Sequence, residues 1–532
     1  MKTGWGRSFD KSVPVLRRSA RVVMETMAVI VGLFGTVIAA PLSHAAAAVR
    51  HVPHDYPTIQ AAINASSGAD EIVLDAGVYG ESIDFMGKAI TVRSTDPNDS
   101  RVVEATVING DQRDKAVFFG HGEGKGSVLS GVTVQKVHVK LSYGGVYCSG
   151  SSPTIEKCII KENQGGGIYC SNSSAAITDC TIQENGDGIG CWESSLTVSR
   201  CVISENQRYG IYCGENSSLT LNECLIMENL CTGLSFVDST GTVRDCTISG
   251  NNGGCTMNGG GMSCLSNSSP TIVNCLISGN SSAAGGGIAC DWGCSPVISA
   301  CTITGNSAVM AGGGILCSGN ASPVLTNCVI SRNSVSDGSG GGIYSEGAGI
   351  TLPYPPYLAI PKPVIMNCTI TQNSASGFGG GICSFLSSPV ITNCILWGDF
   401  PHEISGKVKT ITFSDIQSGN FGPGNIKDDP LFVSPAAEDC HLQPDSPCIN
   451  AGTSRGAPPE DREGHPRDKR PDMGAYEYTL PSGTEIIGRK PFEKGFLPGY
   501  LPKTFNSHLH KAIKSFRKGV YRENPFSKGF SP

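Results

Sequence analysis

A short alternation of apolar and polar positions recurs along the middle of the chain. The unit is Cys, any residue, Ile or Leu, two more residues, and Asn or Asp, and it occurs ten times. Its cysteines are 21 to 29 residues apart, apart from one step of 40 between Cys328 and Cys368. These cysteines are Cys158, Cys180, Cys201, Cys224, Cys246, Cys275, Cys301, Cys328, Cys368 and Cys394. A fixed period of this length indicates a repeat architecture.

Each repeat holds three short runs of strand type, separated by Gly, Asn and Ser. The runs are too short for helices, and Pro and Gly interrupt any helical period. The sequence therefore predicts an all-β parallel β-helix with three-strand coils, in which Cys and Ile form inward ladders. The final Asn of each unit forms a turn ladder between coils and tolerates the left-handed conformation. Triple glycines such as Gly285–Gly287 provide another turn with positive φ.

The repeats resemble the right-handed parallel β-helix repeats of the pectate-lyase-like superfamily over roughly residues 50 to 478. They are especially similar to polymorphic outer-membrane protein repeats, whose hallmarks are Gly-Gly-Ala-Ile and Phe-x-x-Asn. This chain has Gly-Gly-Gly-Ile and Ile-x-x-Asn instead, and no C-terminal membrane β-barrel is recognised in it. The start, Tyr56–Ile63, resembles the short capping helix of secreted β-helix proteins. Such a cap shields the open end of a solenoid.

Four segments follow from these patterns. Residues 1–48, with a basic lead, an uncharged run and Ala45-Ala46-Ala47, are expected to be a signal peptide, with an uncleaved anchor as the alternative. Residues 49–428 form the β-helix, with clear repeats over 144–399. Residues 429–478 resemble the C-terminal module that closes anchored bacterial β-helix surface proteins. Residues 479–532 are a basic tail with a net charge of +7, expected to be flexible, with a role in surface attachment as the alternative.

The net charge and the cysteine content of the chain exclude some classes of function. Lys and Arg number 40 and Asp and Glu 46, a net charge of −6, which excludes a nucleic-acid binder driven by an overall basic field. There are 23 cysteines. Most fit the inward ladders and are interpreted as small buried hydrophobes, with no His interleaved as in a zinc site. Cys440 and Cys448 lie outside the ladders, and a disulfide between them is an open alternative.

Catalytic motifs of β-helix enzymes are not recognisable. Gly120-His121-Gly122 matches one polygalacturonase motif, but its companion carboxylate and Arg-Ile-Lys motifs are missing, so we interpret it as coincidence. The leading interpretation is an adhesin-like or carbohydrate-binding scaffold, bacterial, secreted or on the cell surface. We expect a monomer, without a transmembrane helix in the mature chain, that binds a polysaccharide or surface glycan. The alternative is a polysaccharide-acting enzyme, a lyase or a hydrolase.

Two sets of candidate site residues stand out. Alternation points the aromatic residues of one strand column outward, where they could stack on sugar rings or serve as ordinary strand aromatics. An insertion between Cys328 and Cys368 adds two further tyrosines in a Pro-rich loop, which could present them or be a tolerated bulge. The carbohydrate-binding candidates are Tyr147, Tyr169, Trp192, Tyr212, Tyr354 and Tyr357.

The second set is a column of carboxylates that precede the ladder asparagines on four successive coils. Side chains about 4.8 Å apart would repel one another. They could fan into solvent or bind Ca²⁺ between them, which accepts several oxygen ligands with loose geometry. These metal candidates are Glu162, Glu184, Glu205 and Glu228. No other cofactor is expected.

Overall fold

The structure is a computed structural model that describes residues 47–111, 113–138, 144–254, 259–347, 360–419 and 422–479. The chain divides into two units at Tyr478 and Thr479, and the first unit carries the repeats. The expected signal peptide, apart from its last two residues, the loop with Tyr354 and Tyr357, and the basic tail after Thr479 lie outside the described residues.

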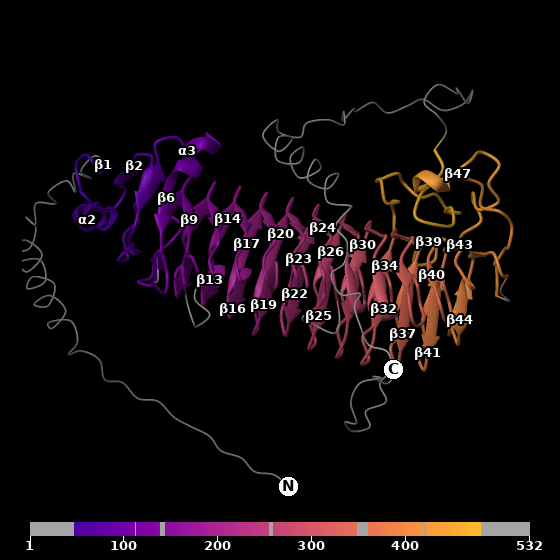
Figure 1. Cartoon of the computed structure of the whole chain (residues 1–532). Helices are drawn as coiled ribbons and strands as arrows, with labels where there is room; N and C mark the ends of the chain where they lie inside the picture. Colours follow the sequence, from indigo (N-terminus) through magenta and orange to yellow (C-terminus); the bar gives the residue numbers. More distant parts are fainter. Residues whose placement is uncertain are drawn as a thin grey trace, which may run out of the picture. The chain divides into compact units, whose positions relative to one another are not determined.

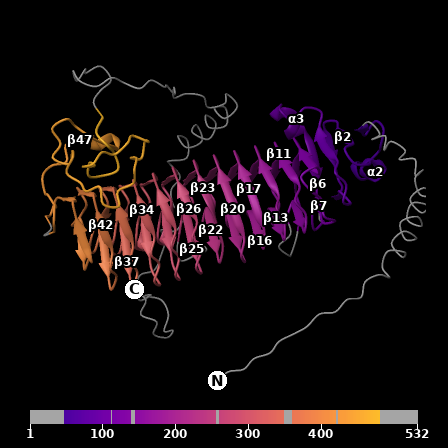
Figure 2. The ribbon, with the colours of Figure 1, turned by 180° about the vertical axis from the view of Figure 1, so that it is seen from behind.

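Three long parallel sheets, here called A, B and C, make up most of the described part of the first unit (Figure 1). From β2 to β46 the chain visits sheets A, B and C in that order, coil after coil. The view from behind shows the same succession of coils (Figure 2). Sheet A contains β1 Val49–Val52, β2 Glu71–Leu74, β5 Thr91–Ser94, β8 Val128–Ser130, β11 Thr154–Glu156, β14 Ala176–Thr178, β17 Ser195–Ser199, β20 Ser218–Asn222, β23 Thr240–Arg244, β26 Thr271–Val273, β30 Val297–Ser299, β34 Val324–Thr326, β38 Val364–Met366, β42 Val390–Thr392 and β45 Thr410–Thr412.

Sheet B contains β3 Gly77–Tyr79, β6 Thr106–Asn109, β9 Thr133–Gln135, β12 Ile159–Lys161, β15 Thr181–Gln183, β18 Val202–Ser204, β21 Leu225–Met227, β24 Thr247–Ser249, β27 Leu276–Ser278, β31 Thr302–Thr304, β35 Val329–Ser331, β39 Thr369–Thr371, β43 Ile395–Trp397 and β46 Asp415–Ile416. Sheet C contains β4 Ile83–Asp84, β7 Val117–Phe119, β10 Val146–Ser149, β13 Gly166–Ser171, β16 Asp187–Trp192, β19 Ile211–Gly214, β22 Leu234–Val237, β25 Met262–Leu265, β29 Ile288–Cys290, β33 Ile315–Cys317, β37 Ile343–Glu346, β41 Ile382–Phe385 and β44 Ile404–Gly406. The predicted all-β parallel β-helix with three-strand coils is confirmed.

Longer coils carry a fourth strand that the period did not predict. In the coils that begin at Cys275, Cys301, Cys328 and Cys368, the next ladder cysteine is at least 26 residues away, and the extra residues between sheets B and C pair with their counterparts in the neighbouring coil. They form the small parallel sheet D, made of β28 Ser281–Ala284, β32 Ser307–Ala311, β36 Ser334–Val335 and β40 Ser374–Ala375.

The predicted N-terminal helix is present as α2, Ile59–Ala65, and the Thr58 side chain caps it by accepting a hydrogen bond from the backbone N–H of Ala61. Ile59 and Ile63 are fully buried and belong to the same apolar cluster as the coils, so the helix closes the first coil. A second helix, α3 Ser100–Ala105, was not predicted from the sequence.

The asparagine ladder forms as predicted, and its members are buried. In each coil the backbone N–H and Nδ2 of one asparagine both donate to Oδ1 of the next, as from Asn185 to Asn206 at 3.0 and 3.1 Å. One expectation is corrected. The left-handed residue of this turn precedes the asparagine, as at Glu184 with a φ of 55° and Glu205 with a φ of 54°.

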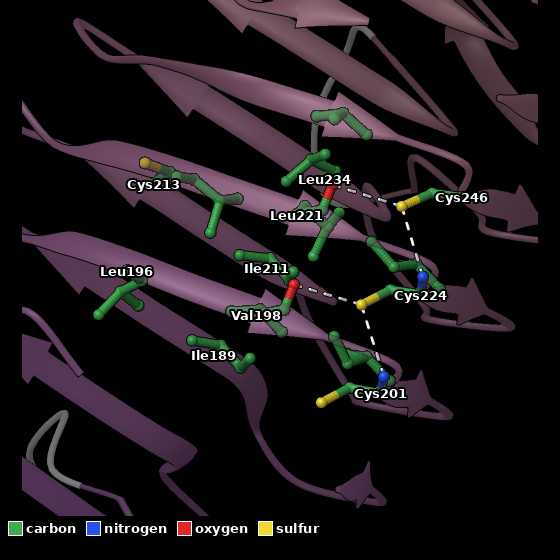
Figure 3. Packing of buried hydrophobic residues seen from close by; sticks show 14 of the residues in the cluster. Ile189, Leu196, Val198, Cys201, Ile211, Cys213, Leu221, Cys224, Leu234 and Cys246 are labelled. Atoms are coloured by element: carbon green, nitrogen blue, oxygen red, sulfur yellow. Dashed lines mark hydrogen bonds between the residues drawn. The ribbon is translucent and has the colours of Figure 1, made fainter. Parts of the chain in front are cut away.

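The cysteine ladder lies inside the coils, next to isoleucines, leucines and valines (Figure 3). The Sγ of Cys224 accepts from the backbone N–H of Cys201 at 3.5 Å and donates to the carbonyl oxygen of Val198 at 3.7 Å. Burial raises the pKa of Cys317 to about 12. The ladder cysteines are free thiols, as are Cys440 and Cys448, so the alternative of a disulfide between those two is wrong. Cys231 is disulfide-bonded.

The segment after the last coil packs on the outer face of sheet B. It contains the antiparallel pair β47 Phe432–Ser434 and β48 Asp439–Leu442, joined by the 3-10 turn η1 Pro435–Ala437 (Figure 1). Phe432, Leu442 and Met473 form an apolar cluster with the sheet B residues Val329 and Ile395. The buried Arg467 donates to Glu477 at 2.8 Å and to Asn327 Oδ1 at 3.1 Å. The outer face of the last coils of sheet B is therefore covered.

Candidate functional site

The outer face of sheet C carries a row of aromatic side chains on its N-terminal coils. Strand register places Asp84, Phe118, Tyr147, Tyr169, Gly190 and Tyr212 opposite one another on successive coils. Their chain neighbours Val146, Cys148 and Ile168 are fully buried in the core. Since strand side chains alternate between faces, the aromatic positions must point outward, where they are half-buried.

The rings of this row contact one another from coil to coil. Phe118 stacks on Tyr147 with ring centroids 5.5 Å apart and an interplanar angle of 23°. Tyr147 lies 5.6 Å from Tyr169. Farther along, Tyr212 contacts Trp192 at 4.8 Å and Tyr209 at 5.3 Å. We refer to Phe118, Tyr147, Tyr169, Trp192, Tyr209 and Tyr212 as the aromatic row.

Glycines in the strands leave room for these rings. A Cβ atom on Gly190 would lie 3.1 Å from Cδ2 of Tyr169 and 3.7 Å from Nε1 of Trp192, so both rings approach the same bare stretch of backbone. A Cβ on Gly214 would lie 2.7 Å from Cε1 of Tyr212. The rings therefore lie against the sheet instead of projecting away from it, and the row forms a shallow apolar surface.

Charged groups flank the row. Lys115 Nζ lies 4.1 Å from the centre of the Phe118 ring, a cation–π contact. At the other end Arg208 pairs with Asp187 at 2.5 Å, and Asp187 also accepts from the backbone N–H of Tyr209 at 3.2 Å. Burial raises the pKa of Asp187 against the opposing charge of Arg208, and burial also raises the pKa of Tyr212. Hydroxyl and charged groups thus border an apolar strip.

A histidine and two carboxylates meet beside Phe118. His121 Nδ1 lies 3.2 Å from Asp84 Oδ1 and 4.0 Å from Glu123 Oε1. The Glu123 carboxylate is fully buried and accepts from the backbone N–H groups of Gly87 and His121, each at 2.8 Å, and from the Ser151 hydroxyl at 2.7 Å. Burial pushes the pKa of Glu123 upward, but these hydrogen bonds outweigh it and hold the pKa below its usual value.

The structure brings together four of the predicted aromatic candidates. Tyr147, Tyr169 and Tyr212 share one column. Trp192 lies two residues after the column position Gly190 on the same strand, where it pairs with Ser171 and Gly214 on the neighbouring strands. Sequence reasoning missed Phe118 and Tyr209. The run Ala116-Val117-Phe118-Phe119 has the right alternation, but it lacks the Gly and Cys that mark the other coils.

The four predicted metal-binding glutamates line one turn between sheets B and C. Lys161 pairs with Glu162 at 3.2 Å. Burial and the charges of Glu228 and Glu184 raise the pKa of Glu205, so the like charges are close enough to interact. Asp84, His121 and Glu123, and not the glutamates, are the described residues that place three potential metal-ligand atoms within 4.8 Å of one another. Calcium binding by the glutamate column stays a prediction.

Among the described residues, the aromatic row ends at Tyr212. The next residues in the column are Ser235, Ser263 and Ala289. Beyond these, Leu316, Tyr344 and Cys383 are buried together with Ala284 and Ala311 near sheet D. The aromatic row therefore occupies the coils between β7 and β19, and Phe385 of β41 is a separate exposed aromatic residue farther along sheet C.

Comparison with known proteins identifies the family to which the repeats belong. A family model described as right handed beta helix region matches residues 121–263 and 255–394, together just over half of the chain. No curated protein matches the chain in sequence. Within the described ranges, no helix combines the length and the apolar composition that crossing a membrane requires.

Several solved structures are similar at low identity. Pectate lyase Pel9A is 15% identical, over 79% of this chain and 91% of that chain, with a TM-score of 0.32. The A-module of the Azotobacter vinelandii mannuronan C-5 epimerase AlgE6 is 13% identical, over 70% and 94%, with a TM-score of 0.37. XylC in complex with xylose is 9% identical, over 80% and 96%, with a TM-score of 0.38. At these values the likenesses carry no argument about activity.

Proposed function

We propose that this chain, which belongs to the right handed beta helix family, is a carbohydrate-binding scaffold that holds a glycan along the aromatic row of sheet C. The observation that carries the proposal is the alignment of half-buried rings on successive coils. They contact one another in two groups, Phe118–Tyr147–Tyr169 and Trp192–Tyr212, and both groups approach Gly190. Aromatic rings offer an apolar face to the C–H surface of a sugar, and the tyrosine hydroxyls and flanking charges can bond its hydroxyl groups.

A glycan array with the purified protein tests this proposal. The double variant Tyr169→Ala, Tyr212→Ala should lose binding to the glycans that the parent protein retains. The matched control is Phe378→Ala, Phe385→Ala, which removes two exposed aromatic side chains outside the row. Unchanged binding in the first variant would make the row a structural feature. New reducing ends or unsaturated products on acidic polysaccharides, lost on mutation of one carboxylate, would instead support the alternative of a polysaccharide-acting enzyme.

We also propose that the protein is exported and acts as a monomer at the bacterial cell surface or outside the cell. Support comes from the basic lead and small-residue site before Ala48, and from the likeness of the repeats to polymorphic outer-membrane proteins. The ordered string in residues 429–478 is similar to the end of anchored surface proteins. Cell fractionation and N-terminal sequencing test this, and a cytoplasmic, unprocessed product would contradict it.

A further inference from the structure

We propose that Asp84, His121 and Glu123 form a binding site for one divalent transition-metal ion, with Zn²⁺ as the representative ion. The site lies at the N-terminal end of the aromatic row, where the His121 ring meets the edge of Phe118 at a centroid distance of 5.9 Å. The proposal stands on these three residues and does not depend on carbohydrate binding.

The geometry suits a single small ion. Asp84 ends β4, and His121 and Glu123 follow β7 on the next coil, so two adjacent coils supply the ligands. The three ligand atoms lie within 4.8 Å of one another, with 3.2 Å between His121 and Asp84 and 4.0 Å between His121 and Glu123. Ligands of a tetrahedral Zn²⁺ with bonds of about 2.1 Å are roughly 3.4 Å apart. Small side-chain movements would therefore close the site around an ion.

The donor set selects the class of metal. One imidazole nitrogen and two carboxylate oxygens suit Zn²⁺ and its neighbours among the transition metals. Calcium and magnesium prefer oxygen ligands throughout. This composition separates the site from the all-carboxylate column of Glu162, Glu184, Glu205 and Glu228, where calcium is the proposed ion.

The buried carboxylate of Glu123 is the second observation that points to a cation. Its side chain is fully buried, and three hydrogen-bond donors fix its orientation, as the outer partners of a metal ligand do. Among the described residues, no Lys or Arg forms an ion pair with Glu123, and His121 Nδ1 lies 4.0 Å from its Oε1. The hydrogen bonds keep the carboxylate charged inside the protein, as a metal ligand must be, and a bound divalent ion would add the cationic partner that it lacks.

The site would keep an open coordination position. Asp84 and His121 are 36% and 52% exposed in their side chains, so solvent reaches the ion from that side. Three protein ligands with a free fourth position are typical of zinc sites that bind water or an external ligand. A ligand oxygen placed there would lie beside Phe118, at the start of the row.

Isothermal titration calorimetry of the full chain with ZnCl₂ and with CaCl₂ tests the proposal. Other histidines can also bind zinc, so the measured quantity is the difference in zinc equivalents between variants. His121→Ala should lose one equivalent per chain, and Asp84→Asn should weaken that equivalent at least tenfold. His54→Ala is the matched control, because His54 is an exposed histidine that pairs with Asp55 at 2.8 Å, and it should lose none.

Circular dichroism checks that each variant is folded, and the exposed position of His121 makes its variant the safer one. An unchanged zinc count in His121→Ala, or equal affinity in Asp84→Asn and the parent chain, would overturn the site. Calcium bound as tightly as zinc, and lost in His121→Ala, would overturn the assignment to a transition metal. Glycan binding measured in the presence of a chelator tests the aromatic row separately, so failure of one proposal is distinguishable from failure of the other.

Discussion

Asp399 Oδ1 accepts hydrogen bonds from both the backbone N–H and the Nδ2 of Asn373, each at 2.8 Å, and thereby ends the asparagine ladder with a carboxyl group. Asn373 Nδ2 also donates to the carbonyl oxygen of Ile330, which lies one coil before Asn373, at 2.9 Å. Asp399 Oδ2 is buried and has no hydrogen-bond partner among the described residues. Burial raises the pKa of Asp399 to about 8, and the charge of Glu403 adds to the shift.

The raised pKa of Asp399 predicts that the protein loses stability as the pH rises. The pKa in the folded state, about 8, is above the value of about 3.9 in an unfolded chain. Between these two values the unfolded chain releases the proton while the folded chain keeps it. The free energy of unfolding should therefore fall by up to about 1.4 kcal/mol per pH unit from this group, and level off above pH 8.

Asp399→Asn should remove this contribution to the pH dependence and raise the stability at neutral pH, because an uncharged amide replaces a carboxyl group that must take up a proton on folding. Urea unfolding between pH 5 and pH 9 measures the effect. Asp238→Asn, at an exposed position, is the control and should keep the slope of the parent protein. If Asp399→Asn shows the same slope as the parent, Asp399 is not the group responsible.

The middle of the asparagine ladder should be sensitive to substitution. Asn206 accepts from the N–H and Nδ2 of Asn185 and donates to Asn229, all of them buried. Asn206→Ala leaves several of these groups unpaired, with an expected loss of roughly 3 kcal/mol or more. Thermal and urea unfolding would measure it. Asn64→Ala, on the exposed face of α2, should change the stability little, and equal effects in both variants would contradict a ladder that holds the coils together.

Gly214→Ala should disturb the aromatic row while leaving the fold intact. The added Cβ would lie 2.7 Å from Tyr212 Cε1, and the ring can turn away because it is on the outer face. We expect weaker glycan binding with little change in melting temperature. Gly80→Ala, which would meet no atom within 4 Å, is the control. Unchanged binding in Gly214→Ala would show that the position of the Tyr212 ring is irrelevant to recognition.

The glutamate column predicts a response to calcium. Repulsion between neighbouring carboxylates costs roughly 1 kcal/mol per pair in a water-like medium, and a bound Ca²⁺ would remove it. We expect calcium to raise the melting temperature of the parent protein relative to chelator. The double variant Glu184→Gln, Glu205→Gln should lose that response. Equal melting temperatures in calcium and chelator for the parent protein would show that the side chains simply point into solvent.

Much of the coil architecture could be predicted because the same residues recur at the same points of every coil. The Cys and Asn positions mark the inward and turn ladders, and the hydrogen bonds from Asn185 to Asn206 follow the predicted pattern. The extra strands of sheet D could not be predicted in this way. The residues of β28, Ser281–Ala284, are small and polar or weakly apolar, and their strand conformation depends on pairing with β32 in the next coil.

The candidate sites differ in the same way: residues inside the regular repeats could be predicted from the sequence, and residues in the irregular early coils could not. Tyr147 and Tyr169 could be aligned from the sequence because each occupies the same place in a repeat. Asp84, His121 and Glu123 could not, because they lie in irregular early coils where no repeat unit sets the register. Gly120-His121-Gly122 resembles one polygalacturonase motif but lacks its companion motifs, and the chain brings Asp84 and Glu123 to His121 only in the folded structure.

The asparagine ladder also bears on how such a gene can change. Each coil makes the same set of bonds to the coil before it and the coil after it, as at Asn206 and Asn229. An in-frame duplication or deletion of one whole coil, arising by recombination between neighbouring repeats, would therefore join two surfaces that already fit. Lineages could alter the number of coils in single mutational steps, and the spacing between the aromatic row and the C-terminal segment would change with it.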